Sequence, residues 1–343
     1  MKQVSIWVNR ALDMGVSKLV IEFRQISRWR PEGTSMKAFL ENKPLNSWQL
    51  SSGDRVAERG RDGSLDSRYT DVPCQDERRV ILKWPGIDND YIHANYVATP
   101  SKDHHFICTQ GPLPTTLHAF WAMVIQEGSE YVLMLCNTVE CNKTKCEQYW
   151  PHDVGDSMSF GEDEEGKITV TNLEAGPMSD EDSFVRVCKL KLDYRINGKD
   201  NSTTVSHFHW ENWPDRGVPE TKLTAIRHTF QNLLTKIRQS PAPIVVHCSA
   251  GIGRTGTIVA ISYVTEKMQN GEDCVAMNEL LKEIRTQRPG SIQNEYQYLY
   301  VHRVLLAYFL EKYRSRFEHV LDGGGEEKYR QWCADYKKAT GCD

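Results

Sequence analysis

The chain opens on apolar residues that recur every three or four positions. They are Val4, Val8, Leu12, Val16, Leu19, Phe23 and Ile26. This spacing predicts one amphipathic helix, or two in succession, ending near Pro31 and Gly33. A helix with a single apolar stripe is typical of packing against the rest of a protein, and we expect that role. Residues 42–66 then become polar, with three glycines, and predict a surface loop or insertion.

Strand signals dominate the middle of the chain. Residues 106–109 and 131–136 are short apolar runs of the length of buried strands. The acidic, glycine-containing residues 153–166 are expected to form a surface loop. From Lys167 apolar and polar residues alternate, which is typical of an antiparallel strand with one solvent-facing side. The Asn-Gly pair at 197–198 then predicts a tight hairpin turn into another strand.

Apolar stripes at helical spacing mark the C-terminal half. The first, over residues 223–237, ends before Pro241. The second, residues 258–268, is apolar nearly all round and predicts a buried helix. A further stripe covers residues 299–310. The glycine- and lysine-rich tail from about residue 323 predicts a weakly ordered end or an additional helix.

Composition narrows the classes of function. The 42 Lys and Arg against 46 Asp and Glu give a formal net charge of −4, which is no nucleic-acid signature. The sequence contains no run of 18 apolar residues, so no membrane-spanning helix is predicted. The N-terminal residues lack the apolar core of a signal peptide. Cys141 and Cys146 are not spaced as a zinc pair, so no metal and no cofactor is expected. Ten scattered cysteines favour reduced thiols and a cytoplasmic protein, with the nucleus as the other compartment that fits.

The most informative stretch runs from Ile244 to Gly256. An apolar β-branched run leads into a glycine-rich turn and then an apolar segment, which predicts strand, loop and helix. The N-terminus of such a helix presents free N–H groups and a positive dipole end, where phosphate binds well. The same field lowers the pKa of a thiol, and Cys248 opens the loop. Arg254 can hold two phosphate oxygens, so the stretch predicts a metal-free phosphoryl-transfer site.

Two other interpretations of this stretch are weaker. A cysteine at a strand end is commonly a small buried hydrophobe, with the glycines serving a tight turn. Glycines 251, 253 and 256 also match the dinucleotide fingerprint GxGxxG. That fold needs a second parallel strand before an acidic residue about 20 positions later. Glu272 and Asp273 stand near that point, but helical spacing follows them without a strand between, and no Lys follows Gly256 as a nucleotide P-loop requires.

Residues 247–256, HCSAGIGRTG, resemble the signature of the protein-tyrosine phosphatases of the classical, non-receptor type. The resemblance implies an α+β fold of the α/β type, with a twisted mixed β-sheet flanked by helices and a cysteine phosphate-binding loop between a strand and a helix. It implies hydrolysis of phosphotyrosine in proteins through a phosphocysteine intermediate. The residues to which it assigns substrate binding in this loop are Ser249, Ala250, Gly251, Ile252, Gly253 and Arg254.

Two further segments match the family in the family's order. Residues 67–74 resemble its substrate-recognition loop, where Tyr69 matches the ring that walls the cleft and Asp71 the carboxylate that takes peptide N–H groups. Residues 213–215 resemble the mobile loop of the general acid, with Trp213 as anchor and Asp215 as acid. A carboxylic acid suits this task, because the tyrosine oxygen is a poor leaving group that needs a proton.

The hydrolysis step has its own candidates. Gln293 and Gln297 match the glutamines that position the attacking water, and their spacing of four predicts that they share one helical face. Thr255 is expected to hydrogen-bond the departing thiolate, and His247 to tune Cys248 from behind.

Supporting positions match less completely. Glu140 matches the residue that braces the catalytic arginine, and Lys145 the one that approaches the general-acid loop. Cys141 stands where a Lys is usual, and His93 stands where an Asn is usual. Arg216, directly after the general acid, replaces an aromatic residue or His, so contact with the substrate ring is expected to change.

The resemblance divides the chain into an N-terminal helical segment at 1–35, a catalytic domain at 36–312 and a C-terminal tail at 313–343. Tyrosine-phosphorylated proteins are the implied partners, with a role in signal transduction. The alternative is a pseudophosphatase that binds phosphotyrosine without turnover. Such proteins usually lack the cysteine, the arginine or the aspartate, whereas this chain has all three.

Overall fold

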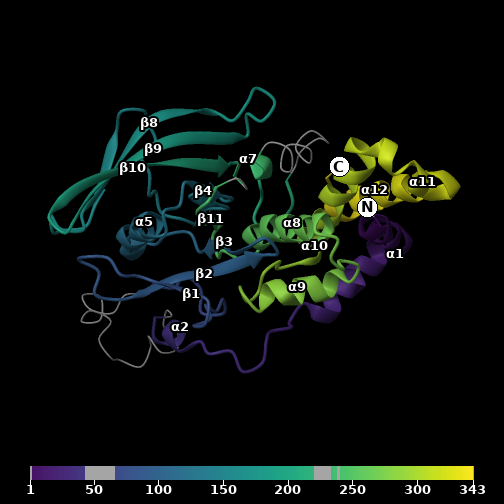
Figure 1. Cartoon of the computed structure of the whole chain (residues 1–343), viewed down its shortest axis with the longest axis horizontal. Helices are drawn as coiled ribbons and strands as arrows, with labels where there is room; N and C mark the ends of the chain where they lie inside the picture. The colour runs from purple at the N-terminus through teal and green to yellow at the C-terminus, as the bar shows by residue number, and fades with distance from the viewer. Residues whose placement is uncertain (1, 43–65, 220–232, 238–239, 343) are drawn as a thin grey trace.

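A computed structural model describes residues 2–42, 66–219, 233–237 and 240–342 (Figure 1). Nine strands in this part of the chain form one sheet in the order β1-β2-β3-β11-β4-β10-β9-β8-β7. Their bounds are β1 (Arg79–Ile81), β2 (Tyr91–Thr99), β3 (Lys102–Thr109), β4 (Tyr131–Met134), β7 (Ser157–Phe160), β8 (Ile168–Pro177), β9 (Val185–Ile196), β10 (Lys199–Trp210) and β11 (Ile244–His247). A separate hairpin pairs β5 (Val139–Glu140) with β6 (Lys143–Thr144).

The sheet is mixed, as expected. β11 lies parallel to both neighbours, β3 and β4, and β10 is parallel to β4, while the remaining pairs are antiparallel. All four residues of β11 are buried, because a central parallel strand is covered on both faces. Ligands bind beyond the carboxyl ends of such strands, and Cys248 is the first residue after this one.

Helices cover both sides of the central strands, with α8 and α10 on one side and α5 on the other (Figure 1). Nearly every residue of α8 is buried, which confirms the prediction from its apolar sequence. The helices are α1 (Lys2–Ile26), α2 (Lys37–Asn42), α5 (Leu117–Gln126), α7 (Thr235–Ile237), α8 (Arg254–Gln269), α9 (Met277–Arg285), α10 (Glu295–Ala307), α11 (Glu318–Leu321) and α12 (Gly325–Thr340).

The two ends of the chain lie side by side (Figure 1). α1 packs against α10 and α12, with the Trp7 ring stacked 5.5 Å from that of His302. It is one helix interrupted at Gly15, which confirms the predicted amphipathic packing segment. The C-terminal tail was predicted to be either weakly ordered or an additional helix, and it forms the helix. Trp332 and Tyr336 of this helix, α12, are buried. The predicted domain limits at residues 35 and 312 stay a prediction.

Some expectations need correction or fall outside the described residues. Residues 153–166 are not wholly loop, because β7 pairs with β8 there and buries Phe160 at the sheet edge. Alternation of polar and apolar residues over only four positions does not distinguish a strand from a loop. The predicted polar loop lies outside the described residues at 43–65, and so does the helical stripe at 223–232. The end of that stripe, at Leu233, Leu234 and Ile237, is buried.

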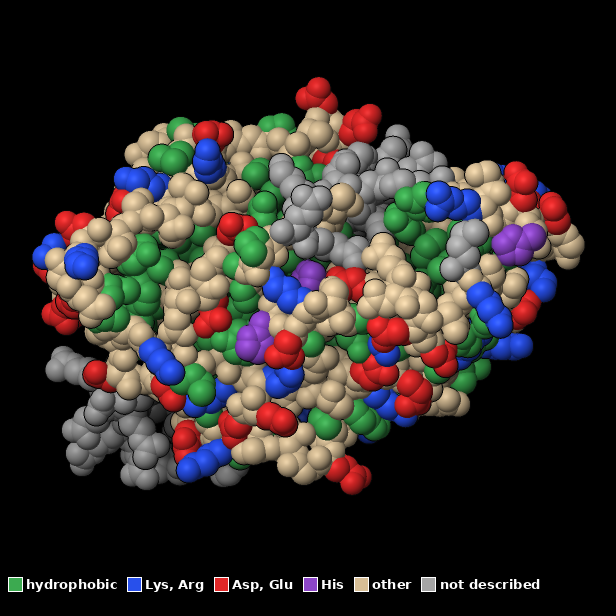
Figure 2. Space-filling model, viewed as in Figure 1, with side chains coloured by type: hydrophobic (Ala, Val, Ile, Leu, Met, Phe, Trp, Pro, Cys, Tyr) green, Lys and Arg blue, Asp and Glu red, His purple; other side chains and the backbone are tan. Residues whose placement is uncertain are grey.

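The surface carries both signs of charge. Lys and Arg are interspersed with Asp and Glu over the face shown in Figure 2. Among the described helices none has the length and apolar character needed to cross a bilayer. All ten cysteines are free thiols.

Candidate active site

The loop after β11 folds around the Cys248 sulfur. Cys248 is 3% exposed, and the N–H of Gly251 donates to its Sγ at 3.3 Å. Gly251 has a positive φ of 68°, and a Cβ there would overlap the Thr109 carbonyl. A Cβ on Gly253, the N-cap of α8, would overlap the amide group of Gln293. Close approach of neighbouring groups therefore requires glycine at both positions.

The surroundings of Cys248 favour its thiolate. Burial alone would raise the pKa of this thiol, but the positive charge of Arg254 and hydrogen bonding from Thr255 and Gly251 outweigh it. The pKa of Cys248 is therefore below its ordinary value. The backbone N–H of Thr255 contributes to this lowering, and its buried Oγ1 has no hydrogen-bond partner among the described residues.

Arg254 is held rigidly at the first position of α8. Its guanidinium is almost wholly buried and donates to Glu140 Oε1 at 2.6 Å and Oε2 at 2.9 Å. Glu140 comes from the β5–β6 hairpin, so the expected brace is present. Arg254 Nη1 also donates to the Trp213 carbonyl at 2.8 Å. The loop of Trp213 is thus bonded directly to Arg254.

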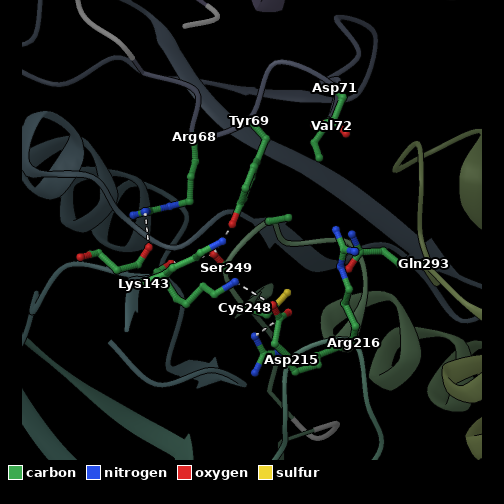
Figure 3. A pocket seen from close by; sticks show the side chains of 14 residues that line it. Arg68, Tyr69, Asp71, Val72, Lys143, Asp215, Arg216, Cys248, Ser249 and Gln293 are labelled. Atoms are coloured by element: carbon green, nitrogen blue, oxygen red, sulfur yellow. Dashed lines mark hydrogen bonds and ion pairs between the residues drawn. The ribbon is translucent and has the colours of Figure 1, made fainter. Parts of the chain in front are cut away.

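Asp215 points into the same pocket as Cys248 (Figure 3). Its Oδ2 lies 2.7 Å from Lys145 Nζ, and its Oδ1 lies 3.6 Å from Arg254 Nη2. Burial raises the pKa of Asp215, but the bond from Lys145 and the charges of Arg254 and Arg216 outweigh it and lower the pKa. A phosphate dianion bound beside this carboxylate would raise the pKa again, which a proton donor requires. The two ends of this loop are joined by a hydrogen bond, in which the Trp213 indole N–H donates to the Gly217 carbonyl at 3.1 Å.

The two glutamines converge, but not on one helical face as predicted. α10 begins at Glu295, so Gln293 lies before the helix and Gln297 within its first turn. Asn294 is the N-cap, and its Oδ1 accepts the N–H of Gln297 at 3.0 Å. Gln297 Oε1 accepts the N–H of Gln293 at 2.9 Å. Both side-chain amides lie against Gly253, and Gln297 Nε2 is buried with no hydrogen-bond partner among the described residues.

Tyr69 walls one side of the pocket. Its hydroxyl is 2.8 Å from Ser249 Oγ, which in turn donates to the Lys145 carbonyl at 3.0 Å. The ring packs against Val72, Ala250 and Ile252. Arg68 fixes the segment by donating to the carbonyls of residues 111, 112 and 144. Asp71 stands exposed at the rim, away from Cys248 (Figure 3).

His247 precedes Cys248, and its ring nitrogens contact the Tyr149 hydroxyl and the Cys248 carbonyl. Its Nε2 is 2.6 Å from the Tyr149 hydroxyl, and its Nδ1 is 3.2 Å from the Cys248 carbonyl. Burial lowers the pKa of His247 to about 3, so the ring is neutral near pH 7. A neutral ring orients the Cys248 backbone and adds no charge beside the thiolate.

Arg288 is a supporting residue that the sequence interpretation missed. It is fully buried and donates to the carbonyls of Gly251 at 3.1 Å and Ala250 at 3.3 Å. Its Nη2 is also 3.1 Å from His93 Nδ1, and His93 Nε2 is 2.9 Å from the Val72 carbonyl. Burial, with the charge of Arg288, lowers the pKa of His93 to about 3. His93 therefore links the loop of Cys248, through Arg288, to the segment of Tyr69 and Val72.

The result is one cavity of about 430 Å³ at the carboxyl end of β11. Of the predicted site residues, those lining it are Tyr69, Asp71, Lys145, Asp215, Cys248, Ser249, Ala250, Arg254 and Gln293. Glu140, Trp213 and Gln297 lie behind this lining and bond to it. Their catalytic and binding roles stay predictions. No group of three or more His, Cys, Asp or Glu side chains in the described ranges is arranged to hold a metal ion.

A family model described as protein-tyrosine phosphatase matches residues 64–307. Tyrosine-protein phosphatase non-receptor type 2 of Mus musculus is 39% identical over 234 residues, which are 66% of this chain and 53% of that protein. Receptor-type tyrosine-protein phosphatase zeta of Homo sapiens is 34% identical over 258 residues, 73% of this chain and 11% of that protein. The chain thus spans about half the length, or less, of these curated relatives.

Solved structures agree with these relatives. The catalytic domain of human protein tyrosine phosphatase non-receptor type 18 superposes with a TM-score of 0.69 at 27% identity. The superposition covers 88% of this chain and 99% of that one.

Proposed function

The chain belongs to the protein-tyrosine phosphatase family, and from this premise we propose that it hydrolyses phosphotyrosine in proteins through a phosphocysteine intermediate. One observation carries the proposal. The Cys248 thiol, its pKa lowered, lies in a loop whose Gly251 N–H and Arg254 guanidinium are fixed beside it. A thiolate within a nest of phosphate-binding donors is suited to attack phosphorus.

In the first step, the Cys248 thiolate attacks phosphorus as the bond from phosphorus to the tyrosine oxygen breaks. Arg254 and the loop N–H groups hold the equatorial oxygens, and their charge stabilises the transition state. Asp215 gives its proton to the leaving oxygen, which departs as a neutral phenol. The ion pair of Asp215 with Lys145 supports this role, because it holds the carboxyl over the pocket.

In the second step, water attacks the phosphocysteine and the bond between sulfur and phosphorus breaks. Asp215, now a carboxylate, takes a proton from this water. Gln293 and Gln297 position it, and the buried Nε2 of Gln297 is a donor near Gly253 that supports this assignment. Thr255 stabilises the departing thiolate, which restores the free enzyme and releases inorganic phosphate.

Tyrosine-phosphorylated proteins are the proposed partners. Non-receptor type 18, a structural relative, has been solved in complex with phosphopeptides of HER2. Ten free cysteines support a reducing compartment, the cytoplasm or the nucleus, and a role in signal transduction is consistent with it. A pseudophosphatase is the weaker alternative, because Cys248, Arg254 and Asp215 are all present and meet in one pocket.

Phosphate release from a phosphotyrosine peptide tests the proposal. The wild type and Cys248→Ser differ by one atom, so binding geometry is kept while the nucleophile is weakened. We expect turnover by the wild type and none above background by the variant. No release by the correctly folded wild type would overturn the proposal and favour the pseudophosphatase.

A further inference from the structure

The Asn294 side chain joins two parts of the active site that come from distant segments of the chain. Its Nδ2 donates to the Arg216 carbonyl at 2.6 Å, and its Oδ1 accepts the N–H of Gln297 at 3.0 Å. Arg216 directly follows Asp215 in the general-acid loop, whereas Gln297 lies in the first turn of α10. One amide group thus contacts both the loop of the proposed acid and the helix of a proposed water-positioning residue.

The backbone of Arg216 needs a restraint from outside the loop. Its φ of 56° lies in the left-handed region, where a residue with a side chain is strained. A conformation of this kind persists only where surrounding contacts impose it. The hydrogen bond from Asn294 to the Arg216 carbonyl is such a contact. The direction of the backbone after Asp215 therefore depends on a residue 78 positions further along the chain.

The ion pair between Asp215 and Lys145 cannot hold the loop with constant strength throughout the reaction. Lys145 Nζ lies 2.7 Å from Asp215 Oδ2, and this contact is strong only while the carboxyl is ionised. The proposed first step uses Asp215 as a neutral acid, and the second step starts from its carboxylate. The hydrogen bond between the Asn294 amide and the Arg216 carbonyl involves no titrating group. It therefore holds the loop in both protonation states of Asp215.

The two glutamines are joined to the same side chain. Gln297 Oε1 accepts the N–H of Gln293 at 2.9 Å. With the two bonds of Asn294, this makes a continuous series of hydrogen bonds from the Arg216 carbonyl to the Gln293 backbone. Arg216 and Gln293 line the pocket on the same side of Cys248 (Figure 3). The bonds of Asn294 therefore relate the position of the glutamines to that of the general-acid loop.

We propose that Asn294 is a positioning residue, which holds the general-acid loop against the two glutamines for hydrolysis of the phosphocysteine. This inference rests on the proposed function, since it concerns the second step of that reaction. One water has to lie within hydrogen-bond reach of Asp215, which takes its proton, and of Gln293 and Gln297, which orient it. These groups belong to two separate segments. A displacement of about 1 Å between reacting groups can cost about 10²-fold in rate.

The two steps of the reaction depend on this contact to different degrees. The first step needs the loop alone, because Asp215 gives its proton to the tyrosine oxygen without the glutamines. The second step needs the loop and the glutamines together. In it the water oxygen forms a bond to phosphorus, the bond from phosphorus to Cys248 Sγ breaks, and the proton of the water passes to Asp215. Loss of the bond from Asn294 to Arg216 should therefore slow the second step more than the first, so that phosphocysteine accumulates.

Two replacements of Asn294 remove its bond to Arg216 and keep the helix cap. Serine and aspartate cap a helix about as well as asparagine, so the N–H of Gln297 keeps an acceptor in both variants. Asn294→Ser adds no charge and is too short to donate to the Arg216 carbonyl. Asn294→Asp keeps the size of the side chain and has an acceptor in place of the donor. Asn201→Ser is the matched control, because exposed Asn201 of β10 also donates its Nδ2 to a backbone carbonyl, that of Lys199.

Rapid mixing with a phosphotyrosine peptide and a denaturing quench measure the two steps separately, as dephosphorylated peptide and as released phosphate. A neutral hydrogen bond corresponds to roughly two- to tenfold in rate. Asn294→Ser and Asn294→Asp should slow phosphate release by about this factor, slow the first step less, and raise the fraction of Cys248 trapped as phosphocysteine. Both should keep the urea unfolding midpoint of the wild type within the effect of a helix cap. Asn201→Ser should match the wild type in every measurement.

A trapped fraction that does not rise in either Asn294 variant, with an active wild type, would overturn this inference and leave the proposed phosphatase activity standing. Asn294 would then serve only as a helix cap. Equal slowing of the two steps would overturn it as well, because the loop and the glutamines would not depend on each other. No dephosphorylation of the peptide by the folded wild type would overturn both this inference and the proposed function.

Discussion

Lys145 Nζ lies 2.7 Å from Asp215 Oδ2, so the proposed general acid is ion-paired before any substrate enters. The two residues come from different loops, 70 positions apart. Lys145 stabilises the carboxylate and lowers the pKa of Asp215, whereas donation of a proton needs the carboxylic acid. The negative charge of the bound substrate phosphate must therefore raise the pKa of Asp215 before the acid can donate a proton.

Removing the Lys145 charge should move the pH dependence of the reaction. Asp215 must be protonated to act, and loss of a cation raises its pKa. We therefore expect the basic limb of the kcat/KM profile, which reports the free enzyme, to shift to higher pH in Lys145→Met. Measurement of kcat/KM on one phosphopeptide from pH 5 to 8 checks this. Lys189→Met, which removes an exposed lysine of β9, is the control and should leave the limb in place.

Replacing Asp215 separates chemistry from binding. Asp215→Ala should lower kcat by about 10²–10⁴-fold, which is roughly 3–5 kcal/mol of barrier. Binding should survive, because Cys248 and Arg254 still hold the phosphate, and it should tighten as a carboxylate near the dianion is lost. The variant should retain tyrosine-phosphorylated proteins from a lysate and release them to vanadate. Unchanged kcat in an active enzyme would remove Asp215 from the mechanism.

The Tyr69 ring should select phosphotyrosine by the depth that it gives the pocket. Phosphoserine peptides are too short to reach Cys248, so the wild type should strongly prefer phosphotyrosine in kcat/KM. Tyr69→Ala should reduce this preference by lowering activity on phosphotyrosine. Tyr69→Phe keeps the ring and loses only the bond to Ser249, so most of the preference should remain. Comparable wild-type rates on the two peptides would contradict this account.

His93 should make folding stability depend on pH. Its pKa is about 3 in the folded protein against the ordinary 6.5, so the unfolded chain takes up the proton first as pH falls. Stability is thus fully present above pH 6.5 and is lost progressively toward pH 3. Between pH 7 and pH 5 this group alone should remove about 2 kcal/mol from the free energy of unfolding.

His93→Asn, which introduces the residue usual in the family, isolates that contribution. Urea unfolding at pH 7 and pH 5 should show a loss about 2 kcal/mol smaller in the variant than in the wild type. Equal losses in the two proteins would mean that His93 is not held neutral by burial and Arg288.

Features of the site that depend on contiguous residues could be predicted from the sequence, whereas features that depend on contacts between distant residues could not. The phosphate loop was predictable because its donors and nucleophile are contiguous in residues 247–256. The role of Arg288 could not be predicted, because it contacts the Gly251 carbonyl 37 positions away in sequence and no local sequence pattern indicates that contact. The prediction that Gln293 and Gln297 share one helical face was wrong, but the sequence held the information to avoid it. Asn294 before Glu295 is a typical N-cap, which places the start of the helix after Gln293. The strand β7 was missed because four alternating residues at a sheet edge carry too little pattern.

Departures from the family were visible in the sequence, but their consequences required the fold. His93 fits because Arg288 and the Val72 carbonyl satisfy both ring nitrogens. Arg216 fits because Asn294 holds its strained backbone. Each depends on a partner far away in sequence.

The central claim, that Cys248 carries the phosphoryl group during turnover, is tested most directly by trapping it. Gln297→Ala should slow the second step by weakening the position of the water, so the intermediate accumulates. Rapid mixing with a phosphotyrosine substrate, denaturing quench and mass spectrometry of the peptide containing Cys248 should then show the added mass of one phosphoryl group on that cysteine. The trapped fraction should decay as inorganic phosphate appears. Turnover with phosphate release but no phosphoryl group on Cys248 at any time, in the wild type or the variant, would contradict the account.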